Sequence, residues 1–298
     1  MARQHSEDHG IVILHIKHST IYRYRQPVIL EPHRLMLRPR ENRDIRLLSH
    51  HIAISPSATA SWAQDAFGNT VTTEHFHAPA DLLSISSHAM MELLARQWND
   101  TDASACAASH PFQYSQAEWA DLSAMAVPRY ADPAERLLDW ARGFVRSQPT
   151  GSLALLQDLC AGISTAIAYQ SREEEGTQTP LQTLARGWGS CRDFAVLFVE
   201  AARCLQFAAR IVSGYLYDAK GASVSTSNST HAWAEIYVPD AGWITFDPTN
   251  RSSGGLVLIP VAVAPDIAQV MPVAGSFNGS SAAYIGMSVD VSIRAENT

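Results

Sequence analysis

The sequence predicts an α+β protein, in which an N-terminal β-sandwich is followed by helices packed on an antiparallel sheet. Three observations support this prediction. Short alternating segments separated by turns fill residues 11–100, apolar residues at three- and four-residue intervals follow between 133 and 205, and alternation returns after residue 209. The 298 residues, 46% of them hydrophobic, are enough for two domains that each have a core.

The first strand is predicted over 13–25, where every second residue faces the same side. Further strands are predicted at 34–39, 49–55 and 71–76, the last one after a turn signal. Repeated short strands of this kind indicate a sandwich domain over 11–100. The histidines of this region scatter over both faces of the strands, so they predict no metal site.

A shift of composition towards Asn, Asp, Ser, Ala and Gln marks a linker over 98–118. The second domain is therefore predicted to span 119–298. Its first helix is expected to begin at Asp132, which caps it and is followed by a proline suited to the first turn. Two more helices are predicted from residues 152 and 179.

The stretch Gly187-Trp188-Gly189-Ser190-Cys191 predicts a tight loop that delivers a cysteine to the start of a helix. Apolar residues then recur at helical spacing, so the helix is expected to be anchored in the core. The partial positive charge at a helix N-terminus favours thiolate over thiol, which makes this cysteine a candidate nucleophile. For a lone cysteine, the alternative is a small buried packing residue.

Two strands, at 231–238 and 243–247, are predicted to form an antiparallel hairpin. A hairpin sets the start of its first strand beside the end of its second, so Asp247 is expected near His231. The chain order Cys191, His231, Asp247 then matches a nucleophile, a base and the carboxylate that orients the base.

The segments that flank this hairpin allow two further expectations. Residues 218–230 are rich in Gly, Ser and Thr, and they predict either a mobile rim over the site or a plain connection. Residues 285–293 alternate most cleanly in the chain, and they are expected to close the sheet behind His231 and Asp247.

These motifs resemble the transglutaminase-like superfamily, whose core carries a Gly-x-Gly-x-Cys helix start, a His-Ala-Trp-x-Glu strand and an Asp-Pro-Thr strand end. The chain is similar to the bacterial two-domain branch, and the resemblance includes its amino-terminal half. It implies a papain-like, transglutaminase-like core with Cys191 as nucleophile, His231 as base and Asp247 as orienting acid. Gln206 departs from the pattern, since such proteins often have glycine after the helix.

Composition and charge exclude several other classes. A formal charge of -7 without dense basic runs argues against nucleic acid as a partner. The four cysteines lack metal-site spacing, and no loop of alternating carboxylates suggests calcium control, so no metal or cofactor is expected. Neither a signal-type run nor a membrane span is evident, which predicts a cytoplasmic protein without a membrane partner. The oligomeric state stays open.

The predicted function is thiol-dependent acyl transfer on peptide or glutamine-type amide bonds through a thioester, with hydrolysis favoured. A protein-glutamine transglutaminase and a catalytically silent peptide-binding module are the alternatives. Either way, the expected partner is a peptide or protein. Trp188 and Trp233 are predicted to wall the cleft, or simply to pack. Tyr169 is predicted as a second oxyanion donor or a core residue.

Overall fold

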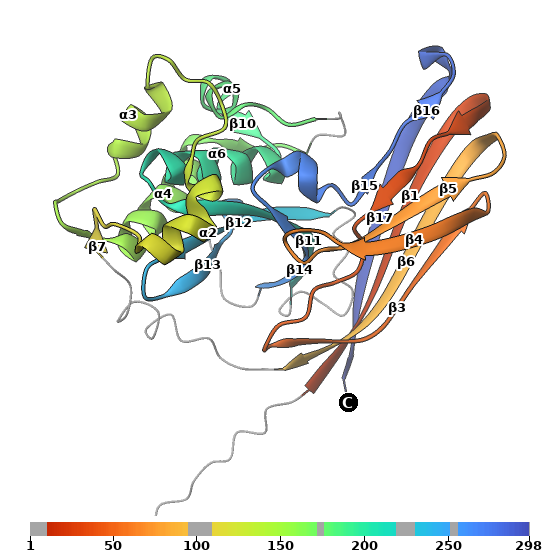
Figure 1. Cartoon of the computed structure of the whole chain (residues 1–298), viewed down its shortest axis with the longest axis horizontal. Helices are drawn as coiled ribbons and strands as arrows, with labels where there is room; N and C mark the ends of the chain where they lie inside the picture. The colour runs from red at the N-terminus through yellow and green to blue at the C-terminus, as the bar shows by residue number, and fades with distance from the viewer. Residues whose placement is uncertain (1–10, 95–108, 172–175, 219–229, 251–255, 298) are drawn as a thin grey trace, which may run out of the picture.

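The protein is an α+β molecule with antiparallel sheets, in which a β-sandwich lies beside a group of helices around a smaller sheet (Figure 1). The structure is a computed structural model. It describes residues 11–94, 109–171, 176–218, 230–250 and 256–297. The antiparallel sheets and the packed helices confirm the α+β fold class predicted from the sequence.

The larger sheet of the sandwich is built on one long strand, β1, which pairs with three others. Alternation places every second residue of β1 on the inner face, as predicted, but the strand continues beyond the predicted end at Arg25 with an irregular register between Arg23 and Val28. The strands of this sheet are β1 (Ile11–Leu30), β3 (Ile45–Ser55), β6 (Ala80–Leu94), β16 (Phe277–Asn278) and β17 (Tyr284–Asn297).

The second sheet of the sandwich has the order β15-β2-β5-β4 and covers one end of the larger sheet. A buried apolar cluster that includes Tyr24, Leu35 and Leu83 lies between them, which is the arrangement predicted for the first 100 residues. The strands of this sheet are β2 (His33–Leu35), β4 (Ala58–Gln64), β5 (Thr70–Phe76) and β15 (Val273–Ala274).

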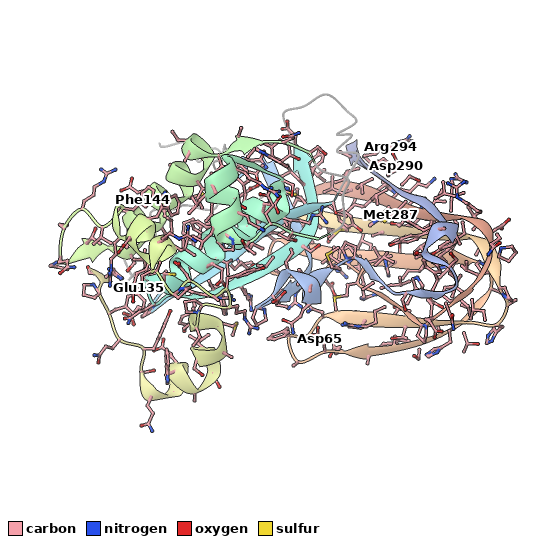
Figure 2. All side chains as sticks on the ribbon, turned by 90° about the horizontal axis from the view of Figure 1, so that it is seen from above. Asp65, Glu135, Phe144, Met287, Asp290 and Arg294 are labelled. Carbon is pink, nitrogen blue, oxygen red and sulfur yellow. The ribbon has the colours of Figure 1, made fainter. Side chains whose placement is uncertain are left out.

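The end of the chain returns to the N-terminal sandwich. β17 pairs with β1 from Val12↔Asn297 to Tyr24↔Tyr284, and Figure 2 shows Met287, Asp290 and Arg294 among the sandwich strands. The prediction that residues 285–293 close the sheet behind His231 is therefore wrong. Alternation predicts that a segment is a strand and which face is buried, but it does not predict the partner strand. The partner is β1, whose edge was free to pair. By strand pairing, residues 273–297 belong with the sandwich rather than with the predicted domain 119–298.

The helical part begins earlier than the sequence indicated. Part of the predicted linker lies outside the described residues, and the rest forms β7 (Ser109–His110) and the start of α2 (Gln116–Ala126). α2 starts with a capping box of Ser115 and Glu118. Sequence reasoning missed this helix start, because it assigned the segment to a linker on its polar composition. α3 begins at Arg136 rather than Asp132, although the Asp132 carboxylate still accepts the Leu137 N–H at 2.7 Å.

The remaining helices agree with prediction. α5 starts where predicted, with Thr179 as its cap in a capping box with Gln182, and α6 begins at Cys191. All residues of α6 from Asp193 to Arg203 are buried, so the helix is enclosed on every side rather than along one stripe. The helices are α3 (Arg136–Arg142), α4 (Ser152–Ala166), α5 (Pro180–Arg186) and α6 (Cys191–Cys204).

The smaller sheet has the order β13-β12-β11-β14, and α6 packs against β11 and β12. Residues of β11 and β14, such as Tyr215 and Ile259, share a buried cluster with Leu14 and Ile16 of β1, which joins the two parts of the molecule. The strands are β11 (Ala208–Asp218), β12 (His231–Val238), β13 (Gly242–Phe246) and β14 (Leu256–Ala264).

Residues 219–229, the core of the predicted rim loop, lie outside the described residues. Within the described ranges, no helix is both long and apolar enough to cross a bilayer.

Candidate active site

The glycine loop before α6 adopts the turn that the sequence predicts. Gly187 ends α5 with φ +68°, a conformation that favours glycine, and Ser190 is the N-cap of α6. A side chain at Gly189 would place its Cβ 2.8 Å from the Cβ of Asp193, so this position also requires glycine. The loop thereby places Cys191, half-buried, at the first position of the helix.

A buried carboxylate, Asp193, fixes this loop. It accepts the N–H and the hydroxyl of Ser190 at 2.8 and 2.9 Å, and the N–H of Gln178 at 2.7 Å. Sequence reasoning missed this role, although a serine followed three residues later by an acid is a capping-box signal. Asp193 therefore ties the cysteine loop to the segment before α5.

Tyr169 is brought beside the cysteine loop by two short parallel strands, β9 (Ala168–Tyr169) and β10 (Trp188–Gly189). The N–H of Gln170 donates to the Gly189 carbonyl at 2.9 Å. Tyr169 is 55% exposed, so it is not the core residue that the sequence left open. Its pKa is raised, first by partial burial and second by the nearby Cys191, which places the phenol within electrostatic reach of the thiol.

The hairpin of β12 and β13 brings the predicted base and acid together. Ala234 pairs with Phe246, so the chain leaving β13 passes the start of β12. The His231 Nε2 donates to Asp247 Oδ2 at 2.8 Å, and both side chains are buried. The hairpin therefore produces the contact that its sequence predicts.

Asn250 is a further member of this cluster that the sequence reading missed. Its side-chain amide donates to Asp247 Oδ2 at 2.8 Å, while the Thr249 N–H donates to Oδ1 at 2.9 Å. Burial works against the charge of Asp247, but the hydrogen bond and charge of His231 and these further donors hold the pKa of the carboxyl below its ordinary value. The carboxylate is thus kept ionised and oriented.

His231 also forms a hydrogen bond with Cys191, which completes the cluster. Burial alone would lower the pKa of the imidazole, but the hydrogen bonds and charges of Asp247 and Cys191 outweigh it and raise the pKa to about 10. Because Nε2 faces Asp247, the nitrogen left for the thiol is Nδ1. The three residues that the sequence singled out therefore meet in space.

The two tryptophans occupy different places. Trp188 is half-buried, and the Arg186 guanidinium lies 5.6 Å from its ring centroid. Trp233 is fully buried, and its ring stacks on His231 at a centroid distance of 5.9 Å. It also lies against Val212 and Val263, so it supports the imidazole from behind and offers no surface to a substrate. The prediction that Trp233 walls the cleft is therefore wrong, whereas its alternative of packing agrees with the structure.

The raised pKa of His231 predicts a pH dependence of stability. A group whose folded pKa rises from 6.5 to about 10 contributes stability that is complete below the unfolded value and is lost as pH rises through about 10. The free energy of unfolding, measured by urea titration from pH 6 to 10, is expected to fall more steeply in the wild type than in His231→Gln. If the free energy of unfolding depended on pH in the same way in both proteins, His231 would not be a protonated imidazole stabilised by its partners.

Among the residues that the structure describes, no three His, Cys, Asp or Glu side chains are grouped in a way that would hold a metal ion. Cys191 and Cys204 are free thiols, and Cys160 is buried.

Comparison with known proteins places this fold and cluster in a family. Residues 14–92 match the N-terminal region of bacterial transglutaminase-like proteins, and residues 138–248 match the transglutaminase-like superfamily core. The chain therefore belongs to the transglutaminase-like superfamily, in its bacterial two-domain form. At the level of the family, this supports a thiol-dependent acyl-transfer or peptidase enzyme.

Several relatives cover more than nine-tenths of the chain. An uncharacterised protein of Mycobacterium tuberculosis (strain H37Rv) is 27% identical and covers 93% of this chain and 91% of its own length. An uncharacterised protein of Mycobacterium leprae is 25% identical over 93% of this chain and 98% of its own. A crystal structure named "Putative Cysteine Protease from Cytophaga hutchinsonii" covers 97% of this chain and 92% of its own, with a TM-score of 0.74 and 17% identity, which shows a shared fold.

Proposed function

We propose that the protein is a cysteine hydrolase of peptide or glutamine-type amide bonds, in which Cys191, His231 and Asp247 form the catalytic triad. The observation that supports this proposal is the continuous hydrogen-bonded chain from the thiol through a buried imidazole to a buried carboxylate. Burial strengthens the charge interactions within this chain, since little water competes for the donors.

The proposed reaction has two steps. The Cys191 sulfur attacks the amide carbonyl carbon, the C–N bond breaks, and the His231 proton passes to the leaving amine. Water then gives a proton back to His231 and attacks the thioester, the C–S bond breaks, and a carboxylic acid is released while the Cys191 thiolate is restored beside the protonated imidazole. Asp247 holds the imidazole in one orientation throughout. If a primary amine replaces water in the second step, the product is a new amide, which is the transglutaminase alternative.

The Cys191 N–H and the Tyr169 hydroxyl are the proposed donors to the oxyanion. The first follows from the position of Cys191 at the start of α6, where backbone N–H groups have no partner within the helix. The second follows from the pairing of Tyr169 with Gly189, which brings this residue beside the cysteine loop. Trp188 is the proposed apolar contact for substrate, because part of its surface remains accessible beside the cysteine loop.

Alkylation tests whether the thiol is activated. Brief, substoichiometric iodoacetamide treatment near pH 7 is expected to modify Cys191 first, because Cys160 is buried and desolvation raises the pKa of Cys204 to about 11. Mass spectrometry of the digested protein locates the label. His231→Ala is expected to slow the labelling of Cys191. Even labelling of the described cysteines, or an equal rate in His231→Ala, would reject the activated thiol and favour the silent binding module.

A substrate screen separates the two enzyme activities. Glutamine-containing peptides are incubated with and without a primary amine, and ammonia release, backbone cleavage and amine incorporation are measured. Hydrolysis without incorporation supports the proposed hydrolase. Incorporation of the amine as the main product would assign the transferase instead, and Cys191→Ala serves as the blank in both cases.

A further inference from the structure

The turn between β4 and β5 of the sandwich, residues 65–69, reaches the smaller sheet that carries His231. Figure 2 shows Asp65 at the end of the sandwich that lies next to the helical part. Asp65 holds the turn in one conformation. Its Oδ1 accepts the N–H groups of Phe67 and Asn69 at 2.9 Å, and its Oδ2 accepts the Asn69 side-chain amide at 2.8 Å. The turn is therefore a preformed element.

Asn69 attaches this turn to the edge of β14 that faces away from β11. The side chain is fully buried, its amide donates to the Val263 carbonyl at 2.8 Å, and its oxygen accepts the Val263 N–H at 2.9 Å. The amide thus takes the place of a neighbouring strand. Arg40 Nη1 donates to the same oxygen at 2.8 Å, and the Arg40 N–H donates to the Pro260 carbonyl of β14 at 2.7 Å. The sandwich therefore fixes the position of β14 by hydrogen bonds.

A small apolar cluster connects this attachment to the imidazole. Val263 packs with Val212 and Trp233, and all three side chains are buried. Phe67 of the turn packs against this cluster. Trp233 in turn stacks on His231. Because protein interiors are close-packed, a shift of Val263 or Phe67 is passed on to the indole and from there to the imidazole.

Gly214 leaves the space that the indole of Trp233 occupies. It lies opposite His231 in the pairing of β11 with β12. A Cβ at Gly214 would be 2.7 Å from Cη2 of the Trp233 ring, so a larger residue would displace the ring. The orientation of the imidazole therefore depends on how closely the indole is packed.

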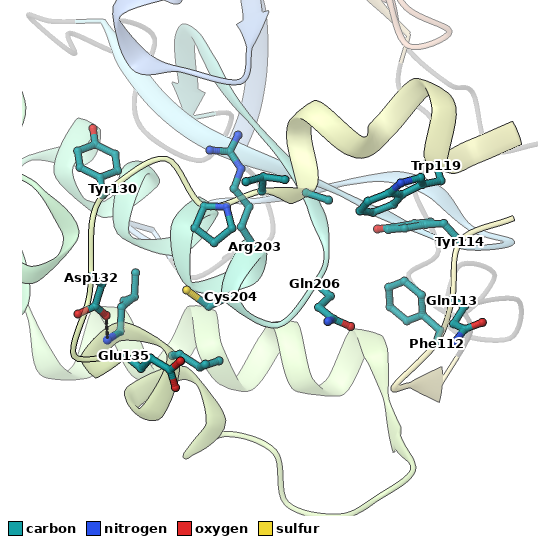
Figure 3. A pocket seen from close by; sticks show the side chains of 15 residues that line it. Phe112, Gln113, Tyr114, Trp119, Tyr130, Asp132, Glu135, Arg203, Cys204 and Gln206 are labelled. Carbon is teal, nitrogen blue, oxygen red and sulfur yellow. Dashed lines mark hydrogen bonds between the residues drawn. The ribbon is translucent and has the colours of Figure 1, made fainter. Parts of the chain in front are cut away.

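A cavity of about 710 Å³ at the far end of α6 is remote from this arrangement (Figure 3). Cys191 is the first residue of the helix, whereas Cys204, its last, lines the cavity. A helix rises about 1.5 Å per residue, so about 20 Å separates the two ends. Glu135 and Gln206 also line the cavity, and a change at either position is not expected to reach His231.

We infer that Phe67 and Asn69 are positioning residues for His231, and that the sandwich thereby completes the active site. The inference rests on the proposed function, because it takes His231 as the base that pairs with Cys191. The turn fixes β14 and the apolar cluster, the cluster holds the indole of Trp233, and the indole holds the imidazole. Catalytic groups keep a productive geometry when the side chains that support them are themselves locked by packing.

Phe67→Ala is expected to slow the reaction of Cys191 with iodoacetamide at pH 7 several-fold, because the gap in the cluster lets the imidazole leave its position. Turnover on whichever peptide the screen identifies should fall about 10- to 10²-fold at an unchanged KM, since a displacement of about 1 Å can have this effect. Phe67→Leu keeps an apolar side chain in place and should recover most of both rates. In a Trp233→Phe background, Phe67→Ala should have a smaller effect, and an undiminished effect there would contradict the inference.

A second variant and two controls keep the test independent of folding. Asn69→Ala removes the hydrogen bonds to Val263 and should lower both rates in the same way. Trp62→Ala removes an aromatic side chain that is 77% exposed on β4 of the same hairpin, and it should match the wild type. Gln206→Gly, which suits a φ of +67°, should match it as well. Urea denaturation gives the folded fraction of each variant, and every rate is expressed per folded molecule.

The outcomes separate this positioning role from the proposed function. If Cys191 reacts no faster in the wild type than in His231→Ala, the proposed function fails and the positioning role fails with it. If the wild type reacts faster, but folded Phe67→Ala and Asn69→Ala react like the wild type, only the positioning role is overturned. Equal slowing in Trp62→Ala would also overturn it, because the effect would then belong to the sandwich as a whole.

Discussion

Asp247→Ala is expected to lower turnover by about 10³- to 10⁴-fold while the protein remains folded, as for carboxylates that orient a catalytic histidine. Asp247 accepts hydrogen bonds from His231 and Asn250 on one oxygen and from the Thr249 N–H on the other. Without it, the imidazole loses its fixed orientation and the charge that holds its proton. Turnover is measured on whichever peptide the screen identifies, with circular dichroism as the test of folding.

Asp240→Asn is the matched control for this variant. Asp240 lies in the turn of the same hairpin, is exposed, and has φ +67°, a conformation that asparagine tolerates. The turnover of the Asp240→Asn variant is expected to equal that of the wild type. Asp247→Asn should resemble Asp247→Ala, because an amide cannot stabilise an imidazolium. Full turnover in either Asp247 variant would remove this residue from the mechanism, whatever the alkylation results show for Cys191.

Glu200→Gln is expected to destabilise the protein by about 3–5 kcal/mol, the usual cost of leaving a buried charge without its partner. Glu200 and Arg203 pair inside α6 and are both fully buried. The other Glu200 oxygen accepts the N–H groups of Arg129 and Tyr130, so the carboxylate also anchors the segment before α3. The free energy of unfolding is measured by urea denaturation at pH 7.

Asp139→Asn provides a control with the same spacing. Asp139 and Arg142 form an i,i+3 pair at 3.7 Å on α3, but both side chains are more than half exposed. An exposed pair contributes about 0–1 kcal/mol, so this variant should have little effect. If Glu200→Gln cost no more than Asp139→Asn, the buried pair would not hold α6 in place. Glu200 is remote from the thiol in the helix, so turnover per folded molecule should change less than stability.

Much of the candidate site could be predicted from the sequence because its signals are local. Gly187, Gly189 and Ser190 specify a turn and a helix cap within a few residues of Cys191. The hairpin from 231 to 247 pairs strands separated by one short turn, which places Asp247 near His231, whereas the exact register is given only by the structure. The spacing of residues along the chain does not show that the hairpin packs close to Cys191 of α6. That expectation came from the family resemblance.

The positioning residues could not be predicted in the same way. Asp193 and Asn250 are ordinary polar residues in the sequence, and only the folded chain shows that Asp193 holds the Gln178 N–H and Asn250 holds Asp247. Trp233 alternates with its neighbours in the strand, which fixes its face of the sheet but not whether that face is covered. Burial depends on what packs from elsewhere in the chain.

The sequence by itself determined the helix that starts at the cysteine and the hairpin that carries the histidine and the aspartate. The tertiary structure alone decided that β17 pairs with β1, that α6 is buried on every side, and that Gln206 and Glu135 border one cavity. Local signals are set by backbone conformation and by periods of two or 3.6 residues. Partners across the fold depend on which edges and faces remain uncovered, and that is settled only when the whole chain has packed.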